Sequence, residues 1–308
     1  MDTILEVNNL SKQFYKNKKL FTAVNGISFT LQRGECLGIV GESGCGKSTT
    51  VKMLTHLLKP DGGDIFLNGT DIQKLRGKSL KEFYTEIQMV FQVPQDSFDP
   101  RKKLGDSIME SMRNHGIGKK EAQNRLEQLL QQVELPTEIA DRYPNQVSGG
   151  QCQRAAIARA LAVNPKILIC DEATSALDPT TTKAILALLK EINEKYGITI
   201  VIITHEMAVV QEICTHVAIV DSGNLAETGT VEEVFSRPKS SAARKLVFQD
   251  ENGKYEEMTG KRCIRIVFKS NSSFEPVIAN MVLACKAPVN ILLADTKDIG
   301  GVAHGQMI

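Results

Sequence analysis

The stretch Gly41-Glu42-Ser43-Gly44-Cys45-Gly46-Lys47-Ser48 decides the fold of this chain. It follows the apolar residues 36–40, which predict a short buried strand, and it precedes residues 49–58, which predict a helix. A glycine-rich loop between a strand and a helix is the setting of a phosphate-binding P-loop. Its glycines let successive backbone N–H groups turn toward one anion, and the helix N-terminus adds partial positive charge. The stretch therefore predicts the binding of a nucleoside triphosphate.

Two side chains at the end of this loop carry the expected chemistry. Lys47 would direct a full positive charge toward the β- and γ-phosphates, and the Ser48 hydroxyl would be a ligand for Mg²⁺. The alternative is a glycine-rich turn that only resembles a P-loop. All the fixed positions of the pattern occur together with the strand and the helix, and this combination favours nucleotide binding.

Length and composition exclude several classes of protein. The 308 residues suggest about two domains, and 37 basic against 36 acidic residues leave no charge excess that would attract nucleic acid. The seven cysteines are scattered and form no CxxC pair, which argues against a disulfide framework or a zinc site and favours a reducing compartment. The N-terminus lacks the pattern of a signal peptide. Apolar runs such as 198–203 are far shorter than the ~20 residues of a membrane span, so a membrane role would act through a partner.

Two layers of strands are predicted. Residues 3–10 and 27–32 alternate apolar and polar side chains, and residues 64–67 run into the tight-turn pair Asn68-Gly69, so we expect an antiparallel layer. Continuous apolar strands alternate with helical patterns farther along, which predicts a parallel sheet covered on both faces and an α/β fold. These strands are 36–40, 166–170 and 198–203, and the helices are 118–135, 152–163 and 181–196.

Phe14 is expected in the loop after the first strand. There its ring could stack on an adenine base, and the alternative is an aromatic residue that packs against its own fold.

Two acidic residues follow the apolar strand 166–170. Asp171 could hold the Mg²⁺ shell and Glu172 could polarise the attacking water as a general base. The alternative is an acidic turn after a strand. Ser148-Gly149-Gly150-Gln151 precede the predicted helix 152–163 and would form a second anion-binding surface, although in isolation an ordinary helix cap at Ser148 explains them as well.

Three more polar residues follow predicted strands or the acidic pair. Gln92 ends an apolar strand and could reach Mg²⁺ or the attacking water. Asp178 lies just beyond the acidic pair, and His205 follows the strand 198–203, where it could contact the γ-phosphate. Each residue alone has an ordinary structural explanation, so the interpretation depends on their joint presence in this order.

This set of motifs resembles the ATP-binding cassette of ABC transporters over about residues 3–247. The resemblance implies a RecA-like parallel core, an antiparallel β subdomain and a helical subdomain. It also implies ATP and Mg²⁺ as cofactors, with Val147 where the family usually has leucine. The implied nucleotide contacts are Phe14, Gly41, Glu42, Ser43, Gly44, Cys45, Gly46, Lys47, Ser48, Thr49, Ser148, Gly149, Gly150, Gln151 and Asp178. The implied catalytic residues are Glu172, His205 and Gln92, and the implied metal ligands are Ser48, Gln92 and Asp171.

Such cassettes work as head-to-tail dimers in which each ATP lies between the P-loop of one subunit and the signature motif of the other, here Ser148–Gln151. The resemblance therefore implies a second cassette, favouring a homodimer. It also implies transmembrane permease subunits, an indirect solute-binding lipoprotein and a place at the cytoplasmic face of the cell membrane. The rival from another class is a soluble ABC ATPase outside transport. Its usual long insertion between P-loop and signature does not fit between Lys47 and Ser148.

Two parts of the sequence differ in the solute they suggest. Residues 171–179 and 204–207 resemble the ATPases of bacterial methionine importers, whereas residues 91–101 resemble those of peptide and nickel importers. We expect a linker at 248–262 and a small ferredoxin-like α+β domain at 263–308, which resembles the regulatory domain of the methionine importer ATPases.

That domain implies a regulatory methionine, with Asn290 as a possible contact, and we expect it to be incomplete at its C-terminus. A packing extension without ligand is the alternative. The domain favours methionine as the solute.

Overall fold

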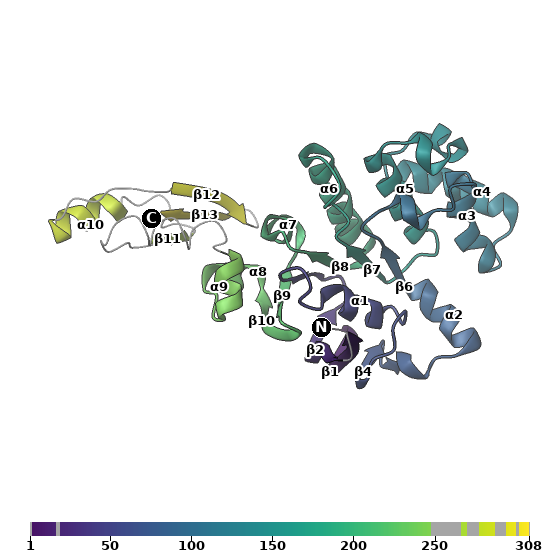
Figure 1. The fold of residues 1–308 in the computed structure, drawn as a ribbon. Helices are drawn as coiled ribbons and strands as arrows, with labels where there is room; N and C mark the ends of the chain where they lie inside the picture. The colour runs from purple at the N-terminus through teal and green to yellow at the C-terminus, as the bar shows by residue number, and fades with distance from the viewer. Residues whose placement is uncertain are drawn as a thin grey trace. The chain divides into compact units, whose positions relative to one another are not determined.

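The computed structural model describes residues 2–16, 19–247, 266–269, 277–286, 294–299 and 302–307. The chain divides into two compact units, residues 1–231 and 232–308, and each is described by itself (Figure 1). The expected linker 248–262 and Asn290 lie outside the described residues. The domain boundary expected at residue 247 therefore stays a prediction.

A six-stranded sheet forms the core of the first unit, in the order β10-β9-β3-β8-β7-β6. All neighbouring strands are parallel except the antiparallel pair β9–β10. Every residue of β3 and β8 is buried, as the continuous apolar runs predicted for a sheet covered on both faces. The bounds are β3 Cys36–Val40, β6 Ile87–Val90, β7 Ile167–Asp171, β8 Thr199–Thr204, β9 His216–Asp221 and β10 Asn224–Thr230.

A four-stranded antiparallel sheet of order β2-β1-β4-β5 forms the second layer. Asn68 and Gly69 connect β4 to β5 with φ values of 49° and 74°, as a type I′ hairpin turn requires at its two central positions. The antiparallel layer and its turn are therefore confirmed. The bounds are β1 Thr3–Lys16, β2 Lys19–Gln32, β4 Gly62–Leu67 and β5 Thr70–Asp71.

The expected loop around Phe14 is wrong. Phe14 lies within β1 and is paired with Phe21 of β2, because the two strands form one long hairpin. The register shifts between Leu10 and Lys12 and again between Lys12 and Gln13. Such bulges break the alternation of side chains while the hydrogen-bonded ladder continues, so the sequence pattern ended before the strand did.

Three helices of the first unit gather beyond β6, namely α3, α4 and α5 (Figure 1). Helix α4 buries Ala122, Leu126, Leu129 and Leu130 along one face, which is the spacing that predicted it. The helices are α1 Lys47–Leu54, α2 Gly77–Glu86, α3 Leu104–Asn114, α4 Lys119–Gln132, α5 Gly149–Leu161, α6 Pro179–Tyr196 and α7 Met207–Ile213. The 3-10 helices are η1 Ile72–Lys74, η2 Gln95–Ser97, η3 Thr137–Asp141 and η4 Pro144–Gln146.

The second unit contains a three-stranded antiparallel sheet of order β11-β13-β12. Helix α10 lies between β11 and β12 in the chain, so this unit is α+β as expected. The predicted strand at 289–294 lies outside the described residues except for Ala294, where β12 begins. The bounds are α8 Val231–Ser236, α9 Ser241–Val247, β11 Ile266–Lys269, α10 Val277–Cys285, β12 Ala294–Ile299 and β13 Val302–Met307. In the part of the chain that the structure describes, no helix combines the length and the apolar character needed to cross a bilayer.

Candidate active site

The parallel order of the core sheet brings the predicted residues to one edge. The P-loop follows β3, Asp171 ends β7, and His205 follows β8 directly. Because the three strands are parallel and adjacent, their carboxyl ends lie side by side. This edge is where open α/β sheets bind ligands.

Two glycines of the P-loop are required by their surroundings. Gly46 has a φ of 109°, and a Cβ atom there would lie 2.3 Å from the carbonyl oxygen of Ala23. A Cβ atom on Gly41 would lie 2.1 Å from the carbonyl oxygen of Val220. The loop is therefore clamped between neighbouring strands, and α1 begins directly after Gly46.

Lys47 lies at the centre of this loop. Its Nζ donates to the carbonyl oxygens of Gly41 at 2.7 Å and of Glu42 at 2.9 Å, and the residue is only 5% exposed. Burial raises the pKa of the neighbouring Cys45 thiol, so this cysteine stays neutral. Glu42, Ser43 and Gly44 form the exposed outer part of the loop, and Thr49 is half-buried in the first turn of α1. The ammonium group is thus held where the loop would enclose phosphate oxygens.

Ser48 and Asp171 are the oxygen donors that could hold a metal ion. The Ser48 Oγ lies 3.5 Å from Asp171 Oδ1, across the gap between α1 and β7. Burial, and then the charge of Glu172, raise the pKa of the Asp171 carboxyl above its ordinary value. No group of three or more histidine, cysteine or carboxylate side chains within the described ranges could hold a metal by itself. The pair fits Mg²⁺, which uses one or two carboxylates and completes its shell with water and substrate phosphates.

Glu172 is at the centre of a small hydrogen-bonded group. Its Oε2 accepts from Gln92 Nε2 at 2.7 Å, and its Oε1 lies 3.3 Å from His205 Nδ1. Gln92 Nε2 also lies 3.4 Å from the Ser175 Oγ, and no sequence pattern predicted this contact. The Glu172 backbone has a φ of 44°, and its N–H donates to the Ile203 carbonyl at 2.9 Å. The structure therefore brings together Gln92, Glu172 and His205, which are far apart in the sequence.

Ser148 to Gln151 form the start of α5 rather than a segment before it. Ser148 Oγ accepts from the Gln151 backbone N–H, and the Gln151 side chain accepts from the Ser148 N–H. This reciprocal cap starts the helix at Gly149, so the helix expected at 152–163 spans 149–161. A Cβ atom on Gly150 would lie 2.5 Å from Thr181 Cγ2, so this glycine allows α5 to approach α6.

Asp178 caps the N-terminus of α6, close to the start of α5. It accepts from the backbone N–H groups of Thr180 and Thr181 and from the Thr181 hydroxyl, and the hydroxyl contact is the main cause of a lowered Asp178 pKa. A cavity of about 300 Å³ opens between Ser148, Gly150 and the two threonines. The signature residues and Asp178 are thus neighbours in the structure, connected through Thr181.

Phe14 lies on the β1–β2 hairpin and is 39% exposed. The Lys12 ammonium lies 5.7 Å from the centre of its ring. The same hairpin reaches the P-loop through the Ala23 carbonyl beside Gly46. An exposed ring near the P-loop is compatible with base stacking, and this role stays a prediction.

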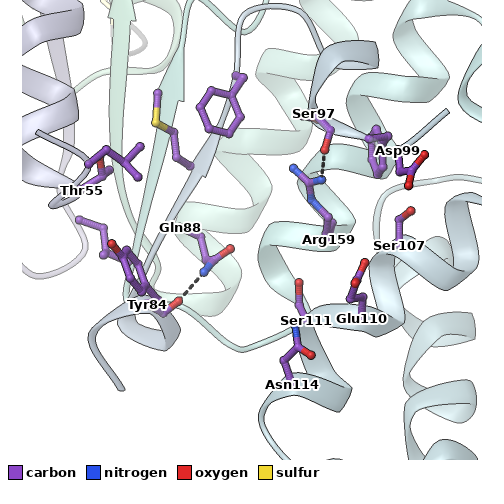
Figure 2. Close-up of a pocket in the computed structure, with 15 residues that line it drawn as sticks. Thr55, Tyr84, Gln88, Ser97, Asp99, Ser107, Glu110, Ser111, Asn114 and Arg159 are labelled. Carbon is purple, nitrogen blue, oxygen red and sulfur yellow. Dashed lines mark hydrogen bonds between the residues drawn. The ribbon is translucent and has the colours of Figure 1, made fainter. Parts of the chain in front are cut away.

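A second cavity, of about 380 Å³, lies between the core sheet and the helices α3 and α5 (Figure 2). Its walls come from the residues just after α1, from the end of α2, from β6, from the segment after β6, from α3 and from Arg159 on α5. The sequence pattern marks residues 91–101 but not the α3 residues or Arg159. Ser107, Glu110, Ser111 and Asn114 have ordinary helical spacing, and no motif marks them.

Comparisons with known proteins identify the class to which this fold and site belong. The family model described as ABC transporter matches residues 24–175, and the model described as NIL domain matches residues 262–308. A dimeric ATP-binding cassette in a post-hydrolysis state, bound to ADP and Pi, is similar with a TM-score of 0.68 and 30% identity, covering 74% of this chain and 99% of that chain. A cassette from Clostridium perfringens that is part of an ABC transporter complex has a TM-score of 0.69 and 31% identity, covering 77% and 92%. The chain is an ABC-transporter ATPase, which binds and hydrolyses ATP; cassettes of this class dimerise and act with permease subunits.

Curated relatives narrow the family further. A methionine import ATP-binding protein of Staphylococcus aureus is 38% identical over 310 residues, covering 97% of this chain and 89% of the relative. A protein of the same name from Clostridium acetobutylicum is 44% identical over 280 residues, covering 90% and 84%. The chain belongs to the family of methionine import ATP-binding proteins. The predicted family, cassette fold and ATPase activity are therefore confirmed.

Proposed function

We propose that this chain uses ATP hydrolysis to drive the import of methionine across the cell membrane. The support is the name shared by relatives that align with nearly the whole chain, together with the NIL match at residues 262–308. The peptide or nickel alternative rests on residues 91–101 alone.

The P-loop binds the triphosphate in this proposal. Lys47 exchanges its contacts with the Gly41 and Glu42 carbonyls for contacts with phosphate oxygens. Ser48 and Asp171 hold Mg²⁺ with Gln92 as a further ligand, and Phe14 stacks on the adenine. Mg²⁺, when bound, neutralises charge on the β- and γ-phosphate oxygens.

One observation carries the catalytic proposal: the Glu172 carboxylate lies between Gln92 at 2.7 Å and His205 at 3.3 Å. A carboxylate oriented from both sides can take the proton of a water molecule that attacks the γ-phosphate. Gln92 and His205 then orient the water and contact the γ-phosphate. Catalysis of this kind depends mainly on positioning and on charge stabilisation.

A second copy of this chain completes each site in this proposal. Ser148–Gln151 form the N-terminus of α5 and bind the triphosphate held by the partner cassette, and Asp178 lies beside them. A helix N-terminus with a serine and two glycines presents free N–H groups to such an anion. The chain therefore acts as a head-to-tail homodimer.

The permease subunits contact the 380 Å³ cavity in this proposal (Figure 2). This cavity adjoins Gln92 through Phe91, which is 40% exposed. The cassette is thereby held at the cytoplasmic face of the membrane and receives solute indirectly from a binding lipoprotein. Residues 263–308 bind methionine as a regulatory ligand.

Uptake measurements test the proposed solute. The chromosomal copy is replaced by Glu172→Gln, and uptake of isotopically labelled L-methionine, a dipeptide and Ni²⁺ is measured. We expect loss of methionine uptake alone. The matched control is Glu191→Gln, which changes an exposed glutamate paired with Lys195 on α6 and should leave all three rates unchanged. Loss of dipeptide or Ni²⁺ uptake, with methionine uptake retained, would assign the other solute class.

A further inference from the structure

Two chain segments connect the group α3, α4 and α5 to the core sheet. The entering segment runs from the end of β6 at Val90 to the start of α3, and the leaving segment runs from the end of α5 at Leu161 to β7. Arg159 lies in the last turn of α5, next to the leaving segment. Its side chain reaches the entering segment, so one residue joins both connections.

The contacts of Arg159 with the entering segment are of two kinds. Its Nη1 donates to the Ser97 carbonyl oxygen, as the dashed line in Figure 2 shows. Its guanidinium carbon lies 4.6 Å from the centre of the Phe98 ring, and Phe98 is only 5% exposed. A hydrogen bond from a charged donor and a cation–π contact therefore converge on two consecutive residues.

The environment of the Arg159 guanidinium explains why its contacts with Ser97 and Phe98 matter for stability. Burial lowers the Arg159 pKa, and the electrostatic interactions with Cys152 and, to a smaller extent, with Glu110 partly offset this effect. Arg159 is half-buried, and a cation that loses part of its hydration needs contacts that compensate for the loss. Removing the Ser97 and Phe98 contacts would therefore leave a poorly compensated charge.

The turn that Arg159 holds is the one that follows Gln92. Three backbone hydrogen bonds build it, from Asp96 N–H to Val93, from Ser97 N–H to Pro94 and from Phe98 N–H to Gln95. Gln92 lies at the near end of this turn, where it donates to Glu172. The position of Ser97 thus restricts the position from which Gln92 reaches the carboxylate.

We propose that Arg159 is a positioning residue that fixes the 95–98 turn to α5 and thereby sets Gln92 against Glu172. Helix α5 begins at the signature residues, and Arg159 lies eleven residues after Ser148, about 17 Å farther along at 1.5 Å per residue. A displacement of the helix at the partner's nucleotide is carried as a rigid element to the turn and to the cavity wall formed by Ser97 and Phe98. The kinetic part of this inference rests on the proposed roles of Gln92 and Glu172.

Hydrogen exchange in the full-length chain tests the anchoring directly. The variants are Arg159→Met, which removes the donor and the charge, and Arg159→Lys, which keeps a cation but loses the planar stack. We expect the Asp96, Ser97 and Phe98 amides to exchange about tenfold faster or more in Arg159→Met, because a charged hydrogen bond and a cation–π contact are lost. The increase should be smaller in Arg159→Lys, which also serves as the test if Arg159→Met does not fold.

The matched control is Arg154→Met. Arg154 lies on the same helix but donates to the Val133 carbonyl and to the Glu134 carboxylate, away from the 95–98 turn. Exchange at the three amides should stay at the native rate in this control. Native exchange rates in both Arg159 variants, or an equal increase in Arg154→Met, would overturn the proposal.

Steady-state ATP hydrolysis separates positioning from a purely structural role. We expect kcat to fall about three- to tenfold in Arg159→Met with the KM for ATP within about twofold, and partial recovery in Arg159→Lys. A native kcat despite faster exchange would make Arg159 only structural and would overturn the proposal. The proposed base fails separately if Glu172→Gln retains turnover, because the exchange result does not depend on it.

Discussion

Replacing Glu172 by glutamine should abolish turnover while preserving nucleotide binding. The change removes the charge that would accept a proton and keeps the size and shape of the side chain. A positioned general base contributes about 10²- to 10⁴-fold to the rate. At 1.36 kcal/mol for each tenfold change, the barrier to hydrolysis should rise by about 2.7 to 5.4 kcal/mol.

The effect on folding should be much smaller. Glutamine can still accept from Gln92 Nε2, so the variant loses the charge assistance of two hydrogen bonds but keeps a polar partner. Neutral and charge-assisted hydrogen bonds differ by about 1 kcal/mol. The two bonds together therefore cost at most about 2 kcal/mol, and at about 2–4 °C per kcal/mol for a compact unit of this size the Tm should fall by no more than about 4–8 °C. Lost turnover with a Tm lowered by no more than this amount would therefore reflect chemistry and not unfolding.

The assay combines three measurements on the purified full-length chain. Phosphate release gives kcat, a fluorescent ATP analogue gives the Kd, and size-exclusion chromatography with ATP and Mg²⁺ shows whether a dimer accumulates. The Kd should stay within about threefold, because the phosphates contact the P-loop and not this carboxylate. The Glu191→Gln control should behave as the native chain. Turnover within tenfold of the native rate would refute the assignment of Glu172 as the base.

Two further predictions concern the P-loop and the metal ligand. Gly46→Ala should lose ATP binding and melt at a lower temperature, because its φ of 109° and the Ala23 carbonyl both oppose a Cβ atom, whereas Gly34→Ala, with positive φ but open space, should lose stability only. Fluorescent-nucleotide titration and thermal melting distinguish the two variants, and equal effects would contradict this reasoning. Asp171→Asn should hydrolyse ATP poorly and yet be more stable than the native chain without nucleotide at neutral pH. The folded Asp171 pKa is raised, so the native chain loses stability as the pH rises from the ordinary value of 3.8 through the folded pKa. Urea unfolding at pH 5 and pH 7.5 measures the free energy of unfolding of both proteins. The variant should be the more stable at pH 7.5, and its advantage over the native chain should be equal or smaller at pH 5. A native chain that is more stable than the variant at both pH values would contradict the prediction.

The sequence was sufficient to predict the features of the fold that depend on local chemistry. The loop 41–48 was predictable from the sequence because parts of its backbone require glycine. The structure shows that a Cβ atom on Gly41 or on Gly46 would clash with a backbone carbonyl oxygen. Continuous apolar runs in the sequence likewise predicted the buried strands β3, β7 and β8. Periodic helices such as α4 were also readable, with errors at their ends where a cap and not the periodicity decides the first residue.

Other features could not be read because their causes are non-local. The first strand seemed to end before Phe14 because bulges disturb the alternation, while pairing with β2 keeps the strand intact. Arg159 looked like any polar residue of a helix, because its partners are 61 and 62 positions earlier in the chain.

The sequence by itself therefore determined the class of the protein, since phosphate binding needs particular residue types at fixed short spacings that a linear pattern can record. Only the tertiary structure decided which separate residues act together. The parallel order of β3, β8 and β7 brings the P-loop, His205 and Glu172 to one sheet edge, and the turn held by Arg159 brings Gln92 to the same carboxylate. Strand order and side-chain contacts arise from packing between segments distant in the chain, so no local pattern contains them.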